Sequence, residues 1–368
     1  MKVLFIAPLP PPITGHSLVS KVLLDALARQ HRIEVVDLSV GSSNDGSVSV
    51  RRLREVAKIL MSVVRRGGGA DAGYLTIAES FAGNLKDLLI YLLWSRRLSR
   101  MYLHLHGGSI KRLLFDRHPL VRRLNALAIR RVGGVIISGR SHEQIFAGMV
   151  APGRLHIVPN FAPESLFIPL ATVEGKFASV RPLSVLYLSG MTTGKGYLDL
   201  AHAYLRLSDE TKGMVQLDFA GRFDSDAECA AFKALIAGTG GIRYHGLVDD
   251  ATKARLFAEA HVFCLPTAMF EGQPISILEA YAAGCVVVAT GQAGILDVFQ
   301  SGINGFEVET NDPASIGAII RRLVAMDATA LAAIAMRNRR IAETEYRTDA
   351  FTTRVANILF GRPIDVTS

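Results

Sequence analysis

Two glutamates, Glu271 and Glu279, stand in the stretch FEGQPISILEAYAAG at residues 270–284, with seven residues between them. Carboxylates in enzymes bind metals, exchange protons or attack carbon. Pro274 is favoured in a first helical turn, so we expect Glu271 in a loop and Glu279 in the helix that follows. If both were helical, a rise of about 1.5 Å per residue would separate them by about 12 Å. Paired glycosidase carboxyls are about 5 to 9.5 Å apart, so the spacing gives no support to a hydrolytic acid–base pair.

The same stretch offers a binding place for a phosphate. A helix that begins near Pro274 presents the free N–H groups of Ile275, Ser276 and Ile277, where the helix dipole favours an anion. Gly272 lets the backbone approach a ligand closely. The flanking carboxylates could accept hydrogen bonds from hydroxyl groups on either side of a diphosphate, which is the layout of a nucleotide sugar. The alternative is a capping loop with both glutamates solvated, which is the commoner explanation for an arbitrary pair.

Short apolar runs alternate with helical patterns and must position these residues. The runs are continuous and rich in β-branched residues, which is typical of parallel strands covered on both faces by helices. A first series is followed by a proline-containing segment at 161–182, which we interpret as a linker, and then by a second series. The predicted strands are 3–8, 33–38, 73–77, 101–106, 134–138, 155–160, 184–190, 215–221, 242–248, 262–266 and 286–290.

Two such series predict an α/β protein with two Rossmann-like domains, whose ligand we expect beyond the carboxyl ends of the strands, in the cleft between the domains. We assign residues 1–170 to the first domain and 171–346 to the second. An amphipathic helix at about 347–362 follows the second series, and we expect it to cross back to the first domain.

The composition limits the classes of partner. Hydrophobic residues make up 49% of the chain and charged residues 20%, so a large core is expected and disorder is not. We interpret the N-terminal apolar run as a first strand rather than a signal peptide. No apolar run reaches the length of about 18 residues that a membrane span needs. We therefore expect a cytoplasmic protein. The three cysteines, Cys229, Cys264 and Cys285, show no metal-binding spacing.

Positive charge is concentrated in the first half of the chain. Residues 1–180 carry 24 Lys and Arg against 12 Asp and Glu, although the whole chain has a net charge of +8. The basic segments 51–66, 94–100 and 110–131 interleave these charges with Leu, Ile and Val. They fit either ordinary amphipathic helices with solvated basic faces or peripheral binding to an anionic membrane. Nucleic acid is not expected, because aromatic residues are few (7%) and no recognition motif is present.

Several motifs together resemble glycosyltransferase family 4, the retaining nucleotide-sugar transferases of GT-B fold. The most specific is the E-x(7)-E block EGQPISILEAYAAGCVVVAT, together with the Lys-Gly pair in LSGMTTGKGYLDL at 188–200. Shorter matches follow the family's order along nearly the whole chain. They are APLPPPITGHS at 7–17, HLHGG at 104–108, FAGRF at 219–223 and YHGLV at 244–248.

The resemblance implies a role for each matching residue. Glu271 would bind hydroxyls of the donor sugar, Glu279 would bind the ribose, and Lys195 would neutralise the diphosphate. The helix dipole disfavours a cation at a helix start, so a lysine with no role beyond solvation is not expected there. This supports a functional role for Lys195. His106, at a strand end, would hydrogen-bond the donor sugar, although a lone histidine is more often structural. The remaining donor-binding positions would be Gly15, His16, Gly190, Arg222, Gly246, Leu247, Gly272, Gln273, Pro274, Ile275 and Ser276.

Two positions depart from the family pattern. Met191 stands where the family often has an arginine, and Arg222 is either its substitute or a surface residue. His16 stands where the family often has a second glycine; it either contacts phosphate or acceptor, or simply begins a helix. We expect no cofactor and no metal, and we interpret the acidic triplet at 224–226 as a loop before a helix.

The resemblance therefore implies a retaining hexosyltransferase that uses a nucleotide-diphosphate sugar. We expect same-face attack, with the leaving diphosphate accepting the proton of the acceptor. The expected acceptor is a lipid-linked saccharide of bacterial cell-surface polysaccharide or glycoconjugate synthesis, met at the inner face of the cytoplasmic membrane. Two alternatives stay open: a nucleotide-sugar epimerase of similar architecture, and a catalytically inactive nucleotide-sugar-binding protein.

Overall fold

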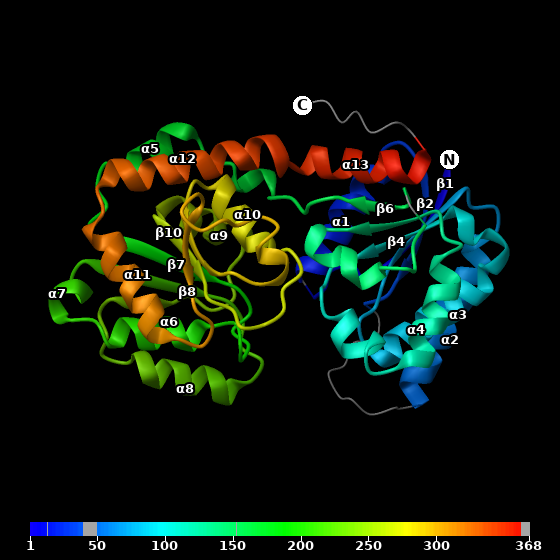
Figure 1. The fold of residues 1–368 in the computed structure, drawn as a ribbon, viewed down its shortest axis with the longest axis horizontal. Helices are drawn as coiled ribbons and strands as arrows, with labels where there is room; N and C mark the ends of the chain where they lie inside the picture. The colour runs from blue at the N-terminus through cyan, green and yellow to red at the C-terminus, as the bar shows by residue number, and fades with distance from the viewer. Residues whose placement is uncertain (13, 40–49, 152, 362–368) are drawn as a thin grey trace. The chain divides into compact units, whose positions relative to one another are not determined.

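The computed structural model describes residues 1–12, 14–39, 50–151 and 153–361. The chain divides into two compact units, each built on a six-stranded parallel sheet. The first unit comprises Met1–Asn160 and the segment from Asp349 onward, and the second comprises Phe161–Thr348. The chain thus leaves the first unit once and returns to it near the C-terminal end (Figure 1).

Continuous apolar runs form the sheet of the first unit, in the order β2-β1-β3-β4-β5-β6. All neighbouring strands pair in parallel, as buried apolar runs require. The strands are β1 (Lys2–Ala7), β2 (Arg32–Asp37), β3 (Ala72–Thr76), β4 (Met101–Leu105), β5 (Gly134–Ile137) and β6 (Leu155–Ile157). The helices are α1 (Gly15–Ala28), α2 (Val50–Gly67), α3 (Phe81–Leu93), α4 (Pro119–Ile129) and α13 (Thr348–Phe360), with shorter turns η1 (Ser95–Arg100), η2 (Lys111–Phe115) and η3 (Arg140–Phe146).

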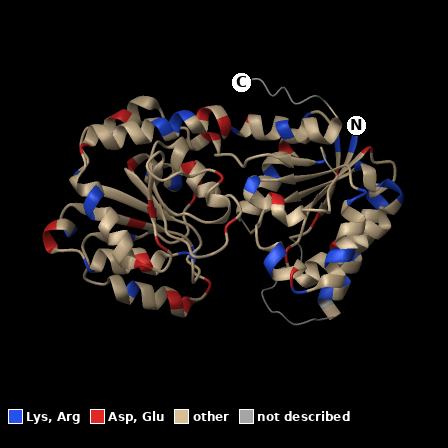
Figure 2. Ribbon diagram, viewed as in Figure 1, with Lys and Arg blue, Asp and Glu red and all other residues tan. Residues whose placement is uncertain are grey.

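The helices of this unit lie in two groups. Helices α2, α3 and α4 gather on one side of the sheet (Figure 1), and Lys and Arg are frequent on and around them (Figure 2). Helix α13 packs into this unit through buried Phe351 and Val355, and the Phe360 ring lies 4.1 Å from that of His31. The last position of the range expected for this helix, residue 362, lies outside the described residues. Of the helices in the described ranges, none combines the length and the apolarity needed to cross a bilayer.

The second unit repeats the plan, with the strand order β12-β11-β10-β7-β8-β9. Its strands are β7 (Leu183–Leu188), β8 (Val215–Ala220), β9 (Ile242–Tyr244), β10 (Val262–Leu265), β11 (Val286–Thr290) and β12 (Gly305–Val308). Its helices are α5 (Leu170–Lys176), α6 (Tyr197–Leu205), α7 (Asp209–Lys212), α8 (Asp226–Ile236), α9 (Asp250–Glu259), α10 (Ile275–Ala282), α11 (Pro313–Ala325) and α12 (Ala328–Glu345), with turns η4 (Glu164–Leu166) and η5 (Ala293–Ile295).

Each predicted strand is present, mostly to within two residues, but the prediction missed β12. This edge strand has only four residues and pairs with β11 alone, so its sequence GFEV contains too short an apolar run to stand out. The prediction also extended the strands near 155–160 and 242–248 too far. In both cases the final residues are the loop beyond a three-residue edge strand.

The segment 161–182, predicted as a linker, packs into the second unit instead. Leu166, Val173 and Phe177 are buried in the hydrophobic core of that unit, and the segment forms η4 and α5. The helix α5 has only seven residues, which is too short a stretch for a helical period to stand out. The division between the units accordingly falls at Asn160–Phe161, ahead of the expected position at residue 170.

Candidate functional site

Lys195 and Glu271 meet in the second unit. Lys195 lies in the loop after β7, and Glu271 lies in the loop after β10, the neighbouring strand of the same parallel sheet. The lysine Nζ is 2.5 Å from the glutamate Oε1, and the two side chains are 22% and 13% exposed. Parallel pairing thus brings together two groups that are 76 residues apart in the chain.

Thr267, which the sequence did not single out, joins this pair. Its Oγ1 lies 3.1 Å from Oε1 of Glu271 and 3.3 Å from the carbonyl oxygen of Gly194. Gly196 has a φ of +82°, and a Cβ there would lie 2.1 Å from the Pro266 carbonyl oxygen. Only glycine fits this close approach of the Lys-Gly loop to the end of β10. The available signal for Thr267 was its place directly after the predicted strand 262–266.

The N-terminus of α10 lies next to Glu271 in the chain. Pro274 occupies the N-cap position, and no side chain of the described residues caps it. Gly272, Pro274, Ile275 and Ser276 are half-buried, whereas Gln273 is buried. The N–H of Ile277 donates to the Pro274 carbonyl at 3.2 Å, so the prediction that this N–H is free was wrong.

Backbone packing fixes the loop before α10. The N–H of Gly294 in η5 donates to the carbonyl of Glu271 at 3.2 Å. A Cβ at Gly294 would lie 1.4 Å from the Gly272 carbonyl oxygen, so two backbones touch there and no side chain fits. The positions of Glu271 and Gly272 relative to the helix start are therefore held by packing.

Glu279 is 4% exposed and faces the protein interior, so the alternative of a solvated Glu279 was wrong. Lys253 of α9 donates to its Oε1 at 2.8 Å, with the lysine side chain 16% exposed. Sequence reasoning missed Lys253, which stands in an unremarkable helix 26 residues earlier. The candidate site thus contains two carboxylates, each paired with a lysine from another element.

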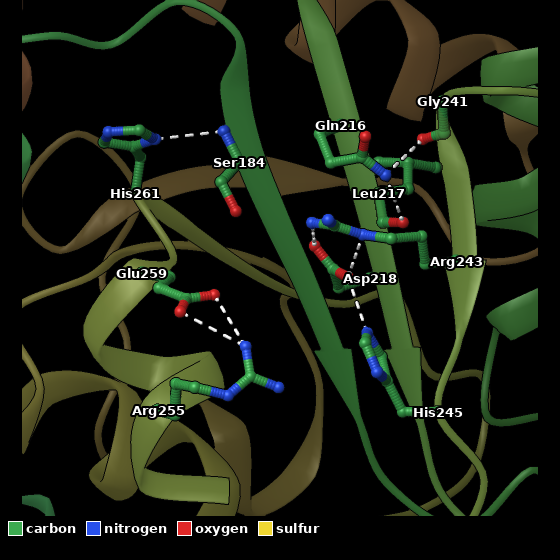
Figure 3. Close-up of polar contacts among 10 residues, drawn as sticks. All are labelled: Ser184, Gln216, Leu217, Asp218, Gly241, Arg243, His245, Arg255, Glu259 and His261. Atoms are coloured by element: carbon green, nitrogen blue, oxygen red, sulfur yellow. Dashed lines mark hydrogen bonds and ion pairs between the residues drawn. The ribbon is translucent and has the colours of Figure 1, made fainter. Parts of the chain in front are cut away.

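A buried carboxylate organises the adjoining end of β8 and β9 (Figure 3). Asp218 accepts two hydrogen bonds from Arg243, both of 2.8 Å, and lies 2.6 Å from Nε2 of His245. His245 leads directly into Gly246, which has a φ of +70°, and Leu247, which is 77% exposed. The two predicted base-contacting residues therefore stand on a turn whose first residue is anchored to Asp218.

Met191 and Arg222 lie side by side at the ends of β7 and β8. The Met191 side chain is fully buried in the core, and its N–H donates to the carbonyl of Arg222 at 2.9 Å. The Arg222 side chain is exposed, and no ion pair involves it in the described part of the chain. Gly190, which precedes Met191, is exposed, and its carbonyl accepts from Tyr187 at 3.2 Å. A cation at position 191 would have to enter the core, whereas one at 222 does not.

Three histidines of the first unit form a cluster in which the His106 ring contacts those of His16 and His104. The His106 ring centroid is 4.4 Å from that of His16 and 3.9 Å from that of His104. The hydroxyl of Tyr74 lies 2.8 Å from Nδ1 of His104. Burial lowers the pKa of His104 to about 3 and that of His16 to about 4, and it lowers the pKa of His106 well below its usual 6.5. The cluster is therefore neutral at ordinary pH.

Neighbouring loops hold this cluster in place. The Thr14 side chain caps α1 by accepting a hydrogen bond from the N–H of Ser17. Gly15 is the first residue of this helix and is exposed, and His16 follows it directly. Glu79 accepts hydrogen bonds from the N–H groups of Ser109 (2.8 Å) and Ile110 (3.0 Å) and so fixes the loop that follows His106. A Cβ at Gly107 would lie 2.2 Å from the Glu79 carboxylate, which explains why glycine follows the histidine.

No group of three or more His, Cys, Asp or Glu within the described residues could hold a metal ion. In the triplet at 224–226 it is Ser225 that caps α8, by accepting from the N–H of Glu228 at 3.2 Å. This is the loop-before-helix arrangement expected there.

Comparisons with known proteins bear on both units. Residues 182–326 match the family model described as glycosyl transferases group 1. The chain is 25% identical over 194 residues to the amylovoran biosynthesis glycosyltransferase AmsK of Erwinia amylovora, covering 49% of this chain and 45% of the relative. It is 28% identical over 191 residues to the O-antigen chain mannosyltransferase B of Escherichia coli, covering 50% and 49%. The matched part thus spans about half the length of either relative.

Structural similarity extends over the whole chain. The crystal structure of Anabaena Alr3699/HepE in complex with UDP superposes with a TM-score of 0.74 at 18% identity, covering 98% of this chain and 100% of that one. A glycosyltransferase from Rickettsia africae superposes with a TM-score of 0.71 at 17% identity, covering 98% of each chain. The chain therefore has the GT-B fold, and its residues 182–326 are similar to the glycosyl transferases group 1 family.

Proposed function

We propose that this protein is a retaining glycosyltransferase of the family 4 type, which moves a hexose-type sugar from a nucleotide-diphosphate sugar to a saccharide acceptor. The observation that carries the proposal is the Lys195–Glu271 ion pair, of 2.5 Å, beside the uncapped start of α10. A cation, a carboxylate and a helix N-terminus together suit a ligand that has both a diphosphate and sugar hydroxyls. The similarity of residues 182–326 to a glycosyltransferase family supports the same conclusion.

In this proposal Lys195 and Glu271 satisfy each other until the donor binds. The diphosphate then competes for the Lys195 ammonium, and the donor-sugar hydroxyls donate to Glu271. Lys195 and the N-terminus of α10 offset the charge that develops on the leaving diphosphate, which is the largest usual contribution to such catalysis. Glu279, paired with Lys253 and buried, is suited to accept hydrogen bonds from the ribose.

Retention is proposed to proceed by attack of the acceptor on the face from which the diphosphate leaves. The acceptor hydroxyl forms the new bond to the sugar carbon while the bond to the diphosphate breaks, and the departing phosphate takes the hydroxyl proton. In this proposal Glu271 accepts hydrogen bonds from the donor-sugar hydroxyls and is not the nucleophile. The protein's contribution is then orientation and electrostatic stabilisation.

The proposed acceptor is a lipid-linked saccharide of cell-surface polysaccharide synthesis, met at the cytoplasmic face of the membrane. Support comes from the printed names of the relatives, which concern amylovoran biosynthesis and an O-antigen chain. The UDP complex of the structural neighbour makes UDP-sugars the first donors to test.

The test is a panel of UDP-, GDP- and ADP-sugars, assayed for release of nucleoside diphosphate and for a sugar product. Slow donor hydrolysis that Lys195→Met lowers by about 10²-fold or more would support the transferase, because that change removes the charge opposite the leaving group. Lys233→Met, which alters an exposed lysine of α8, is the matched control and should keep full activity. Formation of an epimer, or binding without turnover of any donor, would overturn the proposal in favour of an isomerase or an inactive binding protein.

A further inference from the structure

Two neighbouring helices of the first unit turn rows of leucines toward solvent. On α3 these are Leu85, Leu89 and Leu92, and on α4 they are Leu120, Leu124 and Leu127. Both rows have the spacing i, i+4, i+7, which places their members on one helix face. The six side chains are between 39% and 69% exposed. We call these six residues the leucine ridge.

Four polar residues of the same helices point inward. Asn84 of α3 and Asn125 of α4 are fully buried and hydrogen-bond to each other, with the Asn125 Nδ2 donating to Asn84 Oδ1 at 2.7 Å. Lys86 and Asp87 of α3 form a buried ion pair of 2.8 Å. A helix that faces water has the opposite pattern, with apolar residues inside and polar residues outside. Contiguous exposed apolar surface of this kind marks an interaction site.

The ridge is surrounded by positive charge. Residues 81–131 contain eleven Lys and Arg against two Asp and Glu, an excess of nine. Both acids are already paired, Asp87 with Lys86 and Asp116 with Lys111 at 3.1 Å. Figure 2 shows that Lys and Arg positions predominate over Asp and Glu positions on the ribbon around α3 and α4. Arg122, Arg123 and Arg130 line a surface hollow along α4, beside Phe115 and Met149.

We propose that the leucine ridge and its arginines form a surface that docks on an anionic lipid bilayer. The leucines enter the boundary between headgroups and acyl chains, and the arginines bind lipid phosphates, with the hollow along α4 able to receive a headgroup. A second copy of this chain is the less suitable occupant, because two such faces would bring Arg122, Arg123 and Arg130 of one copy against the same arginines of the other. An anionic bilayer complements both the apolar and the basic part of the surface.

This inference deepens the proposed function, since a membrane-bound acceptor would be met at such a surface, but its test needs no activity. Sedimentation with vesicles is measured on the full chain without donor, using phosphatidylcholine alone and phosphatidylcholine mixed with phosphatidylglycerol, at low and high salt. We expect binding to the mixed vesicles only, with a strong decrease at high salt. Failure of binding with intact donor turnover would refute the docking surface alone, and the reverse result would refute the transferase alone.

Two sets of variants separate the apolar and the charged contributions. Leu89→Gln together with Leu92→Gln and Leu120→Gln should weaken vesicle binding by about ten-fold or more, because each leucine loses its apolar transfer from water. Arg122→Gln should weaken it by about five-fold at low salt, and much less at high salt. Leu170→Gln, at a leucine of the second unit that is 45% exposed, is the matched control and should bind as the unaltered protein does.

Three results would overturn the proposal. These are absence of binding to mixed vesicles at low salt, equal binding to neutral and anionic vesicles, and unchanged binding by the ridge variant. Because all altered side chains are exposed, the fold should be preserved, and the fluorescence of Trp94, the single tryptophan, checks this for the first unit. Self-association that the ridge variant abolishes would instead identify a second copy as the occupant.

Discussion

Lys253 of α9 and Glu279 of α10 form an ion pair of 2.8 Å in which the glutamate side chain is 5% exposed. The pair joins two helices of the second unit that flank β10. Its carboxylate is the second glutamate of the E-x(7)-E block, and its lysine comes from a helix in which no motif was recognised. Glu279 thus has a fixed position and a compensating charge before any ligand is bound.

Removal of Lys253 should destabilise the second unit. Lys253→Met leaves the Glu279 carboxylate buried without its cation, which costs on the order of 3 kcal/mol of unfolding free energy. Urea denaturation followed by circular dichroism measures this. Arg255→Met, which breaks the exposed pair between Arg255 and Glu259 on the same helix (Figure 3), should cost less than about 1 kcal/mol. Equal effects of the two changes would contradict the assignment of a buried pair.

The two glutamates of the block should respond differently to substitution. Glu279→Ala should mainly weaken nucleotide binding, by about ten-fold, because it removes acceptors for the ribose hydroxyls. Glu271→Ala should mainly lower turnover, because the donor sugar is no longer held in position. Calorimetric binding of nucleoside diphosphate and steady-state rates distinguish them, with Glu309→Ala as an exposed control. Negligible and equal effects of both changes on activity would refute these roles.

Asp218 should act on nucleotide binding through His245. Asp218→Asn removes the charge that holds Arg243 and His245 and should loosen the turn that carries Gly246 and Leu247. We expect a loss of nucleotide affinity of about five- to ten-fold, equivalent to roughly 1 kcal/mol. The measurement is nucleotide titration, with Arg243→Lys as a comparison that keeps the charge. If affinity is unchanged while thermal stability falls, the network has a structural role only.

The histidine cluster should make the first unit sensitive to acid. In the folded unit the pKa of His16 is about 4 and that of His104 about 3, against 6.5 in an unfolded chain. Between pH 6.5 and about 4 the unfolded chain therefore binds protons that the folded unit does not. The free energy of unfolding is therefore highest above pH 6.5. It decreases as the pH falls below that value, by about 1.4 kcal/mol per pH unit for each histidine.

His16→Gln tests this pH dependence, because it removes one titrating ring from the cluster. The free energy of unfolding should then decrease less steeply as the pH falls, with a slope smaller by about 1.4 kcal/mol per pH unit, which is the contribution of one proton. The single tryptophan, Trp94, lies buried in the first unit, so its fluorescence during urea unfolding at pH 7, 6 and 5 reports on this unit. Identical slopes for the variant and the unaltered protein would show that His16 does not titrate in this way.

Local sequence determined most of the scaffold and part of the candidate site. Buried parallel strands need continuous apolar runs, so the runs predicted each strand except the four-residue β12. Glu271, Gly272 and Glu279 lie in one short stretch, and Pro274 predicted the helix start between them. These features depend on neighbours in the chain, which is why they can be read from it.

Tertiary structure decided which groups meet. Thr267 reaches Glu271 from the end of β10, Lys253 reaches Glu279 from α9, and Lys195 reaches Glu271 across two parallel strands. It also decided which face of an amphipathic helix is buried. The leucines of α3 and α4 have the spacing of a core-facing row, yet they face solvent while Asn84 and Asn125 are buried against each other. Periodicity defines a face, but only packing against the sheet determines where that face points, because burial is a property of the whole fold.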